Sequence, residues 1–308
     1  MKYPIADAHC DYLYGAMEYG WEIQKGKREQ TMTLPNLIEG NVKLQFFAAW
    51  TDTARQMPAL EQVLLMIDRY YHMIESEPKI VKLTRDYQPD GDTISSVLSI
   101  EGAECCEASP SILRDLYRLG VRAMTFTWNS NNELAGAAMG RRPKGLTKEG
   151  KEILKEMNRL GIAFDVSHLS DAGIDDALRY SEVPIFASHS NCRALMNAPR
   201  CLKDEYIKEI ARRGGVIGIN YYGPQLVKSG NAKIEDIVKH IQRVVEIGGI
   251  NACCLGSDFD GMTRYPEDLP NPSRLQDLCK ALEKAGFTES EVEKIAYRNL
   301  HDYIVQFV

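Results

Sequence analysis

The chain has no excess of basic residues and no long hydrophobic run. Its 308 residues include 37 Lys and Arg against 43 Asp and Glu, which leaves a net charge of −6. This balance lacks the basic surface that nucleic acid binding requires, so we expect no nucleic-acid partner. The longest uncharged run, residues 214–227, is interrupted by polar residues and glycine. It is shorter than the roughly 18 apolar residues of a membrane span, so no membrane partner is expected either.

The chain also lacks a CxxC pair and an export signal. The N-terminal segment MKYPIADAHCDYLYG carries a charge at Asp7 and no apolar core of a signal peptide. The eight cysteines include two adjacent pairs in apolar, strand-like surroundings and stand at positions 10, 105, 106, 192, 201, 253, 254 and 279. Reduced, buried thiols are therefore expected rather than disulfides. Together these features predict a cytoplasmic protein.

Short apolar segments alternate with amphipathic helical patterns along the whole chain. Eight segments are typical of strands: 3–10, 42–50, 94–100, 121–127, 161–167, 183–188, 215–220 and 252–257. The clearest helical patterns are 60–74, 148–160, 171–180, 204–213, 234–247 and a closing helix over 288–307. Each connection is long enough for a right-handed crossover helix. This alternation predicts an α/β fold, a (β/α)8 TIM barrel with a single domain over 1–308, in preference to an open sheet.

Ionisable residues gather where the predicted strands end. In a barrel of this type, the chemistry collects at the carboxyl ends of the strands. A long loop over 264–273 follows the last strand and would lie over the same face. The strand-end residues are His9, Asp11, Glu101, His168, His189 and Asp258. The other histidines, at 72, 240 and 301, fall in helical patterns and need no special role.

Imidazole nitrogens and carboxylate oxygens at one barrel mouth are suitable ligands for Zn²⁺ or a similar divalent ion. Three imidazoles and three carboxylates exceed what one tetrahedral ion uses, so a pair of ions sharing a bridging carboxylate is the simpler arrangement. Glu101 lies between the other strands in barrel order and is the natural bridge. Because side chains alternate along a strand, His9 and Asp11 point the same way, and Cys10 points into the packing.

Each of these residues also has a purely structural interpretation. A strand-end histidine can bind a backbone carbonyl, Asp11 can cap a helix, and Asp258 can hold a turn. Glu101 can be a solvated loop acid. A metal centre is favoured because all six residues fall at successive strand ends of one predicted barrel.

The chain resembles the membrane (renal) dipeptidase family of zinc metallopeptidases over nearly its whole length. The matching motifs are DAHCD (7–11), SIEGAE (99–104), LYRLGVRAMTFTWN (116–129), GLTKEGKEILKEMNRLGIAFDVSHLS (145–170), PIFASHSNCRAL (184–195), APRCL (198–202) and LGSDFDG (255–261). The resemblance implies one metal held by His9, Asp11, Glu101 and Asp258, and a second held by Glu101, His168 and His189, with hydroxide between them. It also implies that Arg200 and Tyr222 hold the polar groups of the substrate.

One position departs from the family pattern. Trp128 stands where these dipeptidases have a histidine that is implied to contact the oxygen of the scissile peptide. The absence of this histidine leaves transition-state stabilisation more dependent on the metals, with Asn129 as a candidate hydrogen-bond donor. Trp128 itself is expected to form a wall of the substrate pocket. The segment after the bridging glutamate is also changed, to Glu104-Cys105-Cys106.

The sequence therefore predicts a binuclear dipeptidase that uses two divalent ions, with Zn²⁺ expected, to hydrolyse a dipeptide or a similar small molecule. Glu101 and Asp258 are the predicted catalytic residues, with Asp258 taking and returning the proton. Two alternatives stay open: a related barrel amidohydrolase acting on another amide or ester, and a non-catalytic binding homologue. A homodimer is compatible with the sequence.

Overall fold

Parallel strands form a curved sheet at the centre of the molecule. The computed structural model describes residues 2–27, 29–89 and 91–308. The strands follow the order β6-β5-β4-β2-β1-β8-β7, and all neighbouring strands in this order pair in parallel. Their bounds are β1 (Ile5–Asp7), β2 (Val42–Trp50), β4 (Ile94–Glu101), β5 (Val121–Thr125), β6 (Ala163–Asp165), β7 (Ile217–Ile219) and β8 (Cys253–Leu255).

The segment predicted as the sixth strand, 183–188, forms two single bridges instead of a ladder. Asp165 pairs with Phe186 and Ala187 pairs with Ile217, both in parallel. These bridges join β6 to β7 and complete the ring. The ladder is short because Pro184 has no N–H to donate and because the N–H of Ser188 donates to the Asp165 carboxylate at 2.9 Å. The predicted barrel is confirmed, with its sixth position reduced to bridges.

Several predicted strands are shorter in the structure, and one strand was not predicted. The strand expected over 3–10 spans Ile5–Asp7, and those expected over 161–167, 215–220 and 252–257 span three residues each. At two of these strand ends, a buried aspartate side chain accepts a backbone N–H in place of a carbonyl of the neighbouring strand. Asp7 accepts from the N–H of Ser257 at 2.7 Å, and Asp165 accepts from the N–H of Ser167 at 2.9 Å. The additional strand, β3 (Ile80–Lys82), pairs with the first half of β4.

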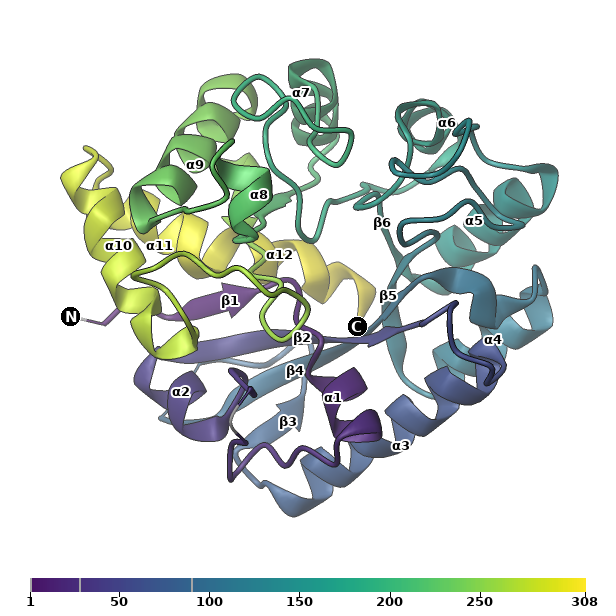
Figure 1. Ribbon diagram of the computed structural model, residues 1–308, viewed down its shortest axis with the longest axis horizontal. Helices are drawn as coiled ribbons and strands as arrows, with labels where there is room; N and C mark the ends of the chain where they lie inside the picture. The colour runs from purple at the N-terminus through teal and green to yellow at the C-terminus, as the bar shows by residue number, and fades with distance from the viewer. Residues whose placement is uncertain (1, 28, 90) are drawn as a thin grey trace.

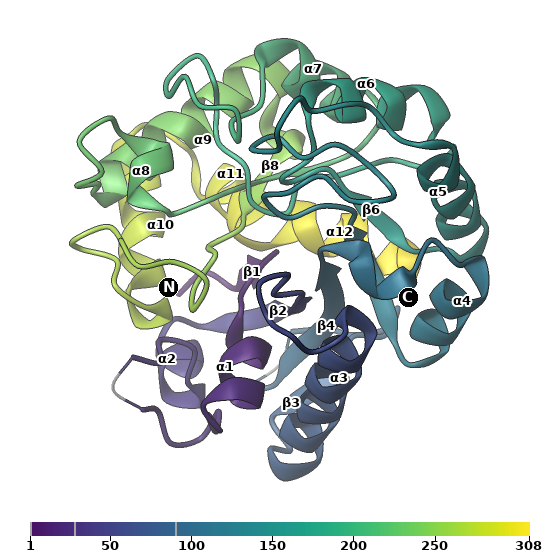
Figure 2. The ribbon, with the colours of Figure 1, turned by 45° about the vertical axis from the view of Figure 1, so that its right-hand side comes forward.

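Helices surround the ring of strands (Figures 1 and 2). All the predicted helices are present, as α3 (Ala59–Ser76), α5 (Lys148–Leu160), α6 (Asp171–Tyr180), α7 (Asp204–Arg212), α9 (Ile234–Gly248) and the closing segment. Threonine or serine side chains cap the N-termini of α5 and α6. The remaining helices are α1 (Tyr12–Glu18), α2 (Leu34–Glu39), α4 (Pro110–Arg118), α8 (Gly223–Leu226) and α10 (Leu275–Lys284).

The closing segment, predicted as one helix over 288–307, contains a π-helical turn. It runs through α11 (Glu289–Glu293), the π-turn Lys294–Arg298 and α12 (Asn299–Ile304) into a short 3-10 turn at Val305–Phe307. Its apolar side chains pack on inward-facing residues of the ring such as Ala6, Leu44 and Phe46. This segment therefore closes one end of the barrel and leaves the other end for the site.

All eight cysteines are buried and unpaired, as predicted. Cys10 is fully buried, and its thiol donates to the carbonyl of Phe46 at 3.2 Å, so it is a packing residue. Among the described helices, none has both the length and the apolar character that crossing a membrane would need.

Candidate functional site: a histidine and carboxylate centre

The six strand-end residues predicted as metal ligands converge at the open end of the barrel. The Nε2 atom of His9 lies 3.4 Å from Asp11 Oδ2, 3.4 Å from Glu101 Oε2 and 3.9 Å from Asp258 Oδ1. The ligand atoms of His9, Glu101 and His189 also lie within 4.8 Å of one another, as do those of His9, Asp11 and Asp258. These groups come from separate segments of the ring, so the fold itself assembles the centre.

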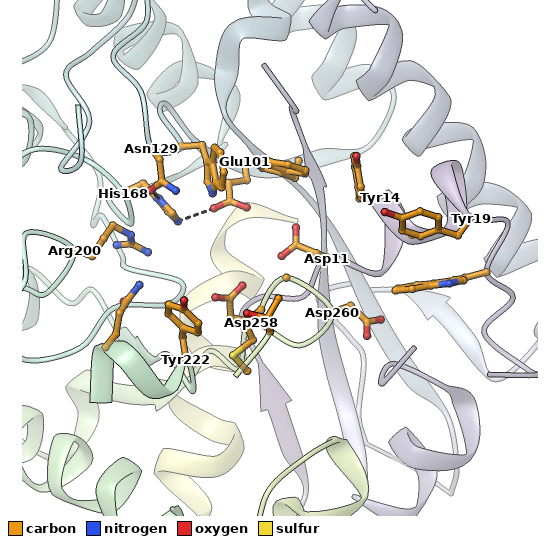
Figure 3. A pocket seen from close by; sticks show the side chains of 18 residues that line it. Asp11, Tyr14, Tyr19, Glu101, Asn129, His168, Arg200, Tyr222, Asp258 and Asp260 are labelled. Carbon is orange, nitrogen blue, oxygen red and sulfur yellow. Dashed lines mark hydrogen bonds and ion pairs between the residues drawn. The ribbon is translucent and has the colours of Figure 1, made fainter. Parts of the chain in front are cut away.

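Glu101, at the end of β4, presents one oxygen to each half of this centre. Its Oε2 faces His9. Its Oε1 lies 2.8 Å from His168 Nε2 and 3.5 Å from His189 Nε2. The side chain is 4% exposed, so Glu101 is not a solvated loop acid. Figure 3 shows the carboxylate pointing into the pocket between His168 and Asp11.

A purely structural role does not match the geometry of Asp11. Asp11 occupies the N-cap of α1, but its side chain makes no capping hydrogen bond. Asp258 does form a turn, in which its carbonyl accepts from the N–H of Gly261 at 3.2 Å, and its carboxylate faces His9. Asp258 has a φ of 64° and His168 a φ of 65°. A residue other than glycine in this left-handed region costs about 1–2 kcal/mol, and such strain concentrates at functional sites.

Hydrogen bonds at Nδ1 fix which nitrogen of each histidine faces the centre. The Oγ of Ser188 donates to the Asp165 carboxylate, so it is free to accept from His189 Nδ1, 2.7 Å away. The Oδ1 of Asn129 lies 3.1 Å from His168 Nδ1 and accepts from it. Both Nε2 atoms are then unprotonated and lie 3.0 Å apart beside Glu101. Converging lone pairs of this kind are suited to bind a cation.

Two buried aspartates below the centre were missed by sequence reasoning. Asp165 accepts hydrogen bonds from Thr125, Ser167 and Ser188. On the opposite side of the ring, Asp7 accepts from Gln45 and Ser257. Each lies inside a predicted apolar segment, 3–10 or 161–167, and an isolated carboxylate there was the available signal.

Burial and mutual charge shift the titration of these groups. Burial would raise the pKa of Glu101, but His9 and His168 lower this pKa well below its usual range. Burial, with the positive charge of Arg200, lowers the pKa of His168 to about 4. Burial also lowers the pKa of His189 well below its usual value. At neutral pH both imidazoles are uncharged, which is the form that binds a metal.

The pKa of Asp258 is shifted in the opposite direction to that of Glu101. Burial, together with the negative charges of Asp11 and Glu101, raises its pKa to about 7 although His9 opposes the shift. Asn220 donates to its Oδ2 at 3.0 Å and so holds the other oxygen toward His9.

A pocket of about 370 Å³ opens above the centre. This is the low end of the range for small-molecule sites and suits a ligand of dipeptide size. Its wall includes all four predicted substrate-binding residues, Arg200, Tyr222, Trp128 and Asn129. Gly261 also lies there, and a Cβ atom at this position would come within 2.0 Å of Asp11 Oδ2, so a glycine is required beside the carboxylates.

Arg200 is a buried cation without a carboxylate partner among the described residues. It is 6% exposed; one terminal nitrogen donates to the carbonyl of His189 at 3.3 Å, and its Nε has no hydrogen-bond partner. Gln225, which sequence reasoning missed, also lines the pocket with an unpartnered Oε1. An unsatisfied guanidinium in a pocket wall is suited to an anionic ligand.

A family model and curated relatives both point to the dipeptidases. A family model described as membrane dipeptidase (peptidase family M19) matches residues 1–303. Two uncharacterized dipeptidases of Schizosaccharomyces pombe are similar to the chain. One is 35% identical over 329 aligned positions, covering 96% of this chain and 78% of the relative. The other is 34% identical over 260 residues, covering 82% of this chain but 62% of the relative, so the chain spans less than two thirds of that protein.

Solved structures show the same fold. A metallopeptidase from Rhodobacter sphaeroides, liganded with a phosphinate mimic of the dipeptide L-Ala-D-Ala, has a TM-score of 0.91 at 23% identity, with both chains covered completely. A dipeptidase described as an M19 metallopeptidase has a TM-score of 0.90 at 24% identity, covering 100% of this chain and 99% of the other. On the family match over nearly its full length, the chain belongs to the membrane dipeptidase family, peptidase family M19.

Proposed function

We propose that this protein is a binuclear metal-dependent dipeptidase, with Zn²⁺ as the ion. The observation that carries the proposal is the placement of Glu101, whose two oxygens face two separate sets of ligand atoms. The unpaired guanidinium of Arg200 in the same pocket supplies a partner for the carboxylate of a small peptide.

The residues present fit a pair of divalent ions. His9 Nε2 and Asp11 Oδ1 are buried and have no hydrogen-bond partner among the described residues, as expected of atoms that bind an ion. His9, Asp11, Glu101 and Asp258 would hold one ion, and Glu101, His168 and His189 the other. Such ions acidify a water molecule and polarise a carbonyl group.

The chain's own groups would orient the substrate and move the proton. Arg200 and Tyr222 hold the free carboxylate of the dipeptide, because a planar cation binds a carboxylate through two hydrogen bonds. Asp258, whose pKa is raised to about 7, takes the proton from the attacking water and returns it to the leaving amine. The Nδ2 group of Asn129 and the indole of Trp128 line the same pocket and complete the contacts with the peptide.

The test combines metal content with a substrate screen. Protein reconstituted with zinc should hold two equivalents and hydrolyse unmodified dipeptides. The same peptides amidated at the carboxyl end should be cleaved with a kcat/KM lower by at least about tenfold, because they lose the charge-assisted bonds to Arg200. Simple amides and esters are run in parallel.

The variant Glu101→Gln keeps the volume of the side chain and removes the charge, so it should lose turnover. A stable content of one zinc would contradict the binuclear centre. Hydrolysis of the amides or esters but of no dipeptide would favour the related amidohydrolase instead. Equal cleavage of free and amidated dipeptides would show that Arg200 does not bind the carboxylate.

A further inference from the structure

Five aromatic side chains form one wall of the pocket. All three tryptophans of the chain line it, together with two tyrosines from α1 and the residue after it: Trp21, Trp50, Trp128, Tyr14 and Tyr19. Consecutive ring centroids are 5.6 Å apart for Trp21 and Tyr19, and 6.4 Å apart for Tyr19 and Tyr14. The row continues at 4.8 Å from Tyr14 to Trp50 and 4.9 Å from Trp50 to Trp128. We call this row the aromatic wall.

The inner end of the aromatic wall reaches the predicted metal ligands. The ring of Trp128 lies 6.4 Å from that of His168, centroid to centroid. Trp128 and Trp50 meet edge to face. The inner part of the wall is therefore next to the place where the scissile peptide would lie, and Tyr19, 56% exposed, forms its outer end.

Contacts with neighbouring residues of the chain hold the wall in place without a ligand. The hydroxyl of Tyr14 donates to Asp52 Oδ2 at 3.3 Å. The ring of Trp21 covers Gly15 so closely that a Cβ atom there would lie 2.0 Å from it. The loop that carries Tyr19 and Trp21 is fastened farther along, where Thr31 donates its N–H and its hydroxyl to Asp260, both at 2.7 Å. A preformed apolar surface loses little entropy when a side chain packs on it.

The aromatic wall and the carboxylate-binding residues lie on opposite sides of the centre. In Figure 3, Tyr14 and Tyr19 stand on one side of Glu101 and Asp11, and Arg200 and Tyr222 stand on the other. A dipeptide whose carboxylate meets Arg200 has its scissile carbonyl at the centre. Its amino-terminal residue then extends toward the wall.

We propose that the pocket selects dipeptides whose amino-terminal residue carries an aromatic side chain. The inference rests on the proposed function, because the orientation follows from the carboxylate at Arg200. An aromatic side chain there meets the edges and faces of Trp50, Trp128 and Tyr14, a geometry that rings favour over plain apolar contact. An amino-terminal alanine leaves the same surface uncovered and exposed to water.

The experiment compares three dipeptides on zinc-reconstituted protein. The kcat/KM for Phe-Ala should exceed that for Ala-Ala by at least roughly tenfold, since a single methylene in an apolar pocket already gives about that factor. Ala-Phe should show no such gain. Trp50→Ala should reduce the ratio of Phe-Ala to Ala-Ala several-fold. Tyr180→Ala, which removes a part-exposed tyrosine of α6 outside the pocket, is the matched control and should preserve the ratio.

The outcomes separate this inference from the proposed function. Equal kcat/KM for Phe-Ala and Ala-Ala overturns the inference and leaves a dipeptidase. A gain for Ala-Phe alone overturns the orientation, and so also the inference. If no dipeptide is cleaved, the proposed function fails, and the wall is then tested by binding, because all three tryptophans report on it. Tryptophan emission should then respond to Phe-Ala at lower concentration than to Ala-Ala, and an equal response overturns the inference.

Discussion

Ser188 is not a predicted substrate contact, but its side chain fixes the tautomer of His189. Its hydroxyl proton goes to Asp165, which as a carboxylate can only accept. The oxygen is thereby left to accept from His189 Nδ1, and the lone pair of Nε2 faces Glu101. Partners of this kind orient a metal-binding imidazole and raise its basicity.

We predict that Ser188→Ala weakens the binding of one zinc by about 10-fold to 100-fold, the usual effect of losing such a partner. Without the acceptor, His189 can adopt the tautomer with a proton on Nε2, which does not bind a metal. The measurement is zinc affinity by competition with a chelator. Ser190→Ala is the matched control, because among the described residues the side chain of this buried serine hydrogen-bonds only to Ser167, at 3.4 Å. Equal zinc affinity in all three proteins would contradict the role of Ser188.

The predicted ligands were readable from the sequence because each lies at the end of a predicted strand segment or directly after it. Glu101 is the last residue of β4, and His9 lies two residues after β1. Asp7 and Asp165 were missed because a single carboxylate inside an apolar run has no partner until the ring closes. The same holds for Trp50, since its neighbours Tyr14 and Trp128 are distant in sequence and meet it only in the fold.

At the scale of elements, helix positions were predicted more closely than strand lengths. The expected helices 148–160 and 171–180 coincide with α5 and α6, because capping residues and apolar spacing mark both ends. The segment 183–188 keeps the apolar pattern of a strand but makes only bridges, since Pro184 has no N–H and the Asp165 carboxylate takes the N–H of Ser188. Competition of this type depends on tertiary contacts and leaves no local pattern.

Helix α9 also contains a histidine for which the sequence indicated no role. His240 is 1% exposed, and its Nδ1 accepts from the N–H of Cys192 at 3.0 Å. Its Nε2 donates to the carbonyl of Leu226 at 3.1 Å. The neutral ring thus ties α9 to the loop at Cys192 and to the end of α8, and burial lowers the pKa of His240 below its usual value.

The buried, neutral His240 predicts that the folded protein becomes less stable as the pH falls. The unfolded chain binds a proton at His240 near its ordinary pKa of about 6.5, whereas the folded protein resists protonation. The stabilisation is therefore complete above that pH and is lost as the pH falls toward the lower pKa of the folded state. The free energy of unfolding of the metal-free protein should decrease between pH 7.5 and pH 5.5, and by less in His240→Gln.

Urea unfolding at the two pH values measures this difference. At pH 7.5 the variant should lose about 1–3 kcal/mol, because buried backbone groups of Cys192 or Leu226 lose a partner. His72→Gln is the control, since this exposed side chain of α3 bonds only within its own helix, at Asp68. If His240→Gln and wild type change equally with pH, His240 does not carry the effect.

For the whole molecule, the centre is the point at which distant segments of the ring meet. Its ligands follow β1, β6, β8 and the bridged segment near Phe186, and one ends β4. Three carboxylates, Asp11, Glu101 and Asp258, face this point. The pKa of His9 lies well above its usual value, and His9 and Arg200 together offset only part of the negative charge. Bound cations would therefore remove repulsion and cross-link the barrel at its open end.

Metal binding should accordingly raise the melting temperature of the entire barrel. A ligand present at 100 times its Kd stabilises the folded state by about 2.7 kcal/mol, and a domain of this size melts about 2 °C higher for each kcal/mol. Adding zinc to chelator-treated protein should thus raise the Tm by about 5 °C, as measured by calorimetry. Glu101→Gln should show a clearly smaller rise, because the residue facing both halves of the centre loses its charge. If zinc shifts the Tm of the variant as much as that of wild type, ion binding does not depend on Glu101, and the six residues do not act as one centre.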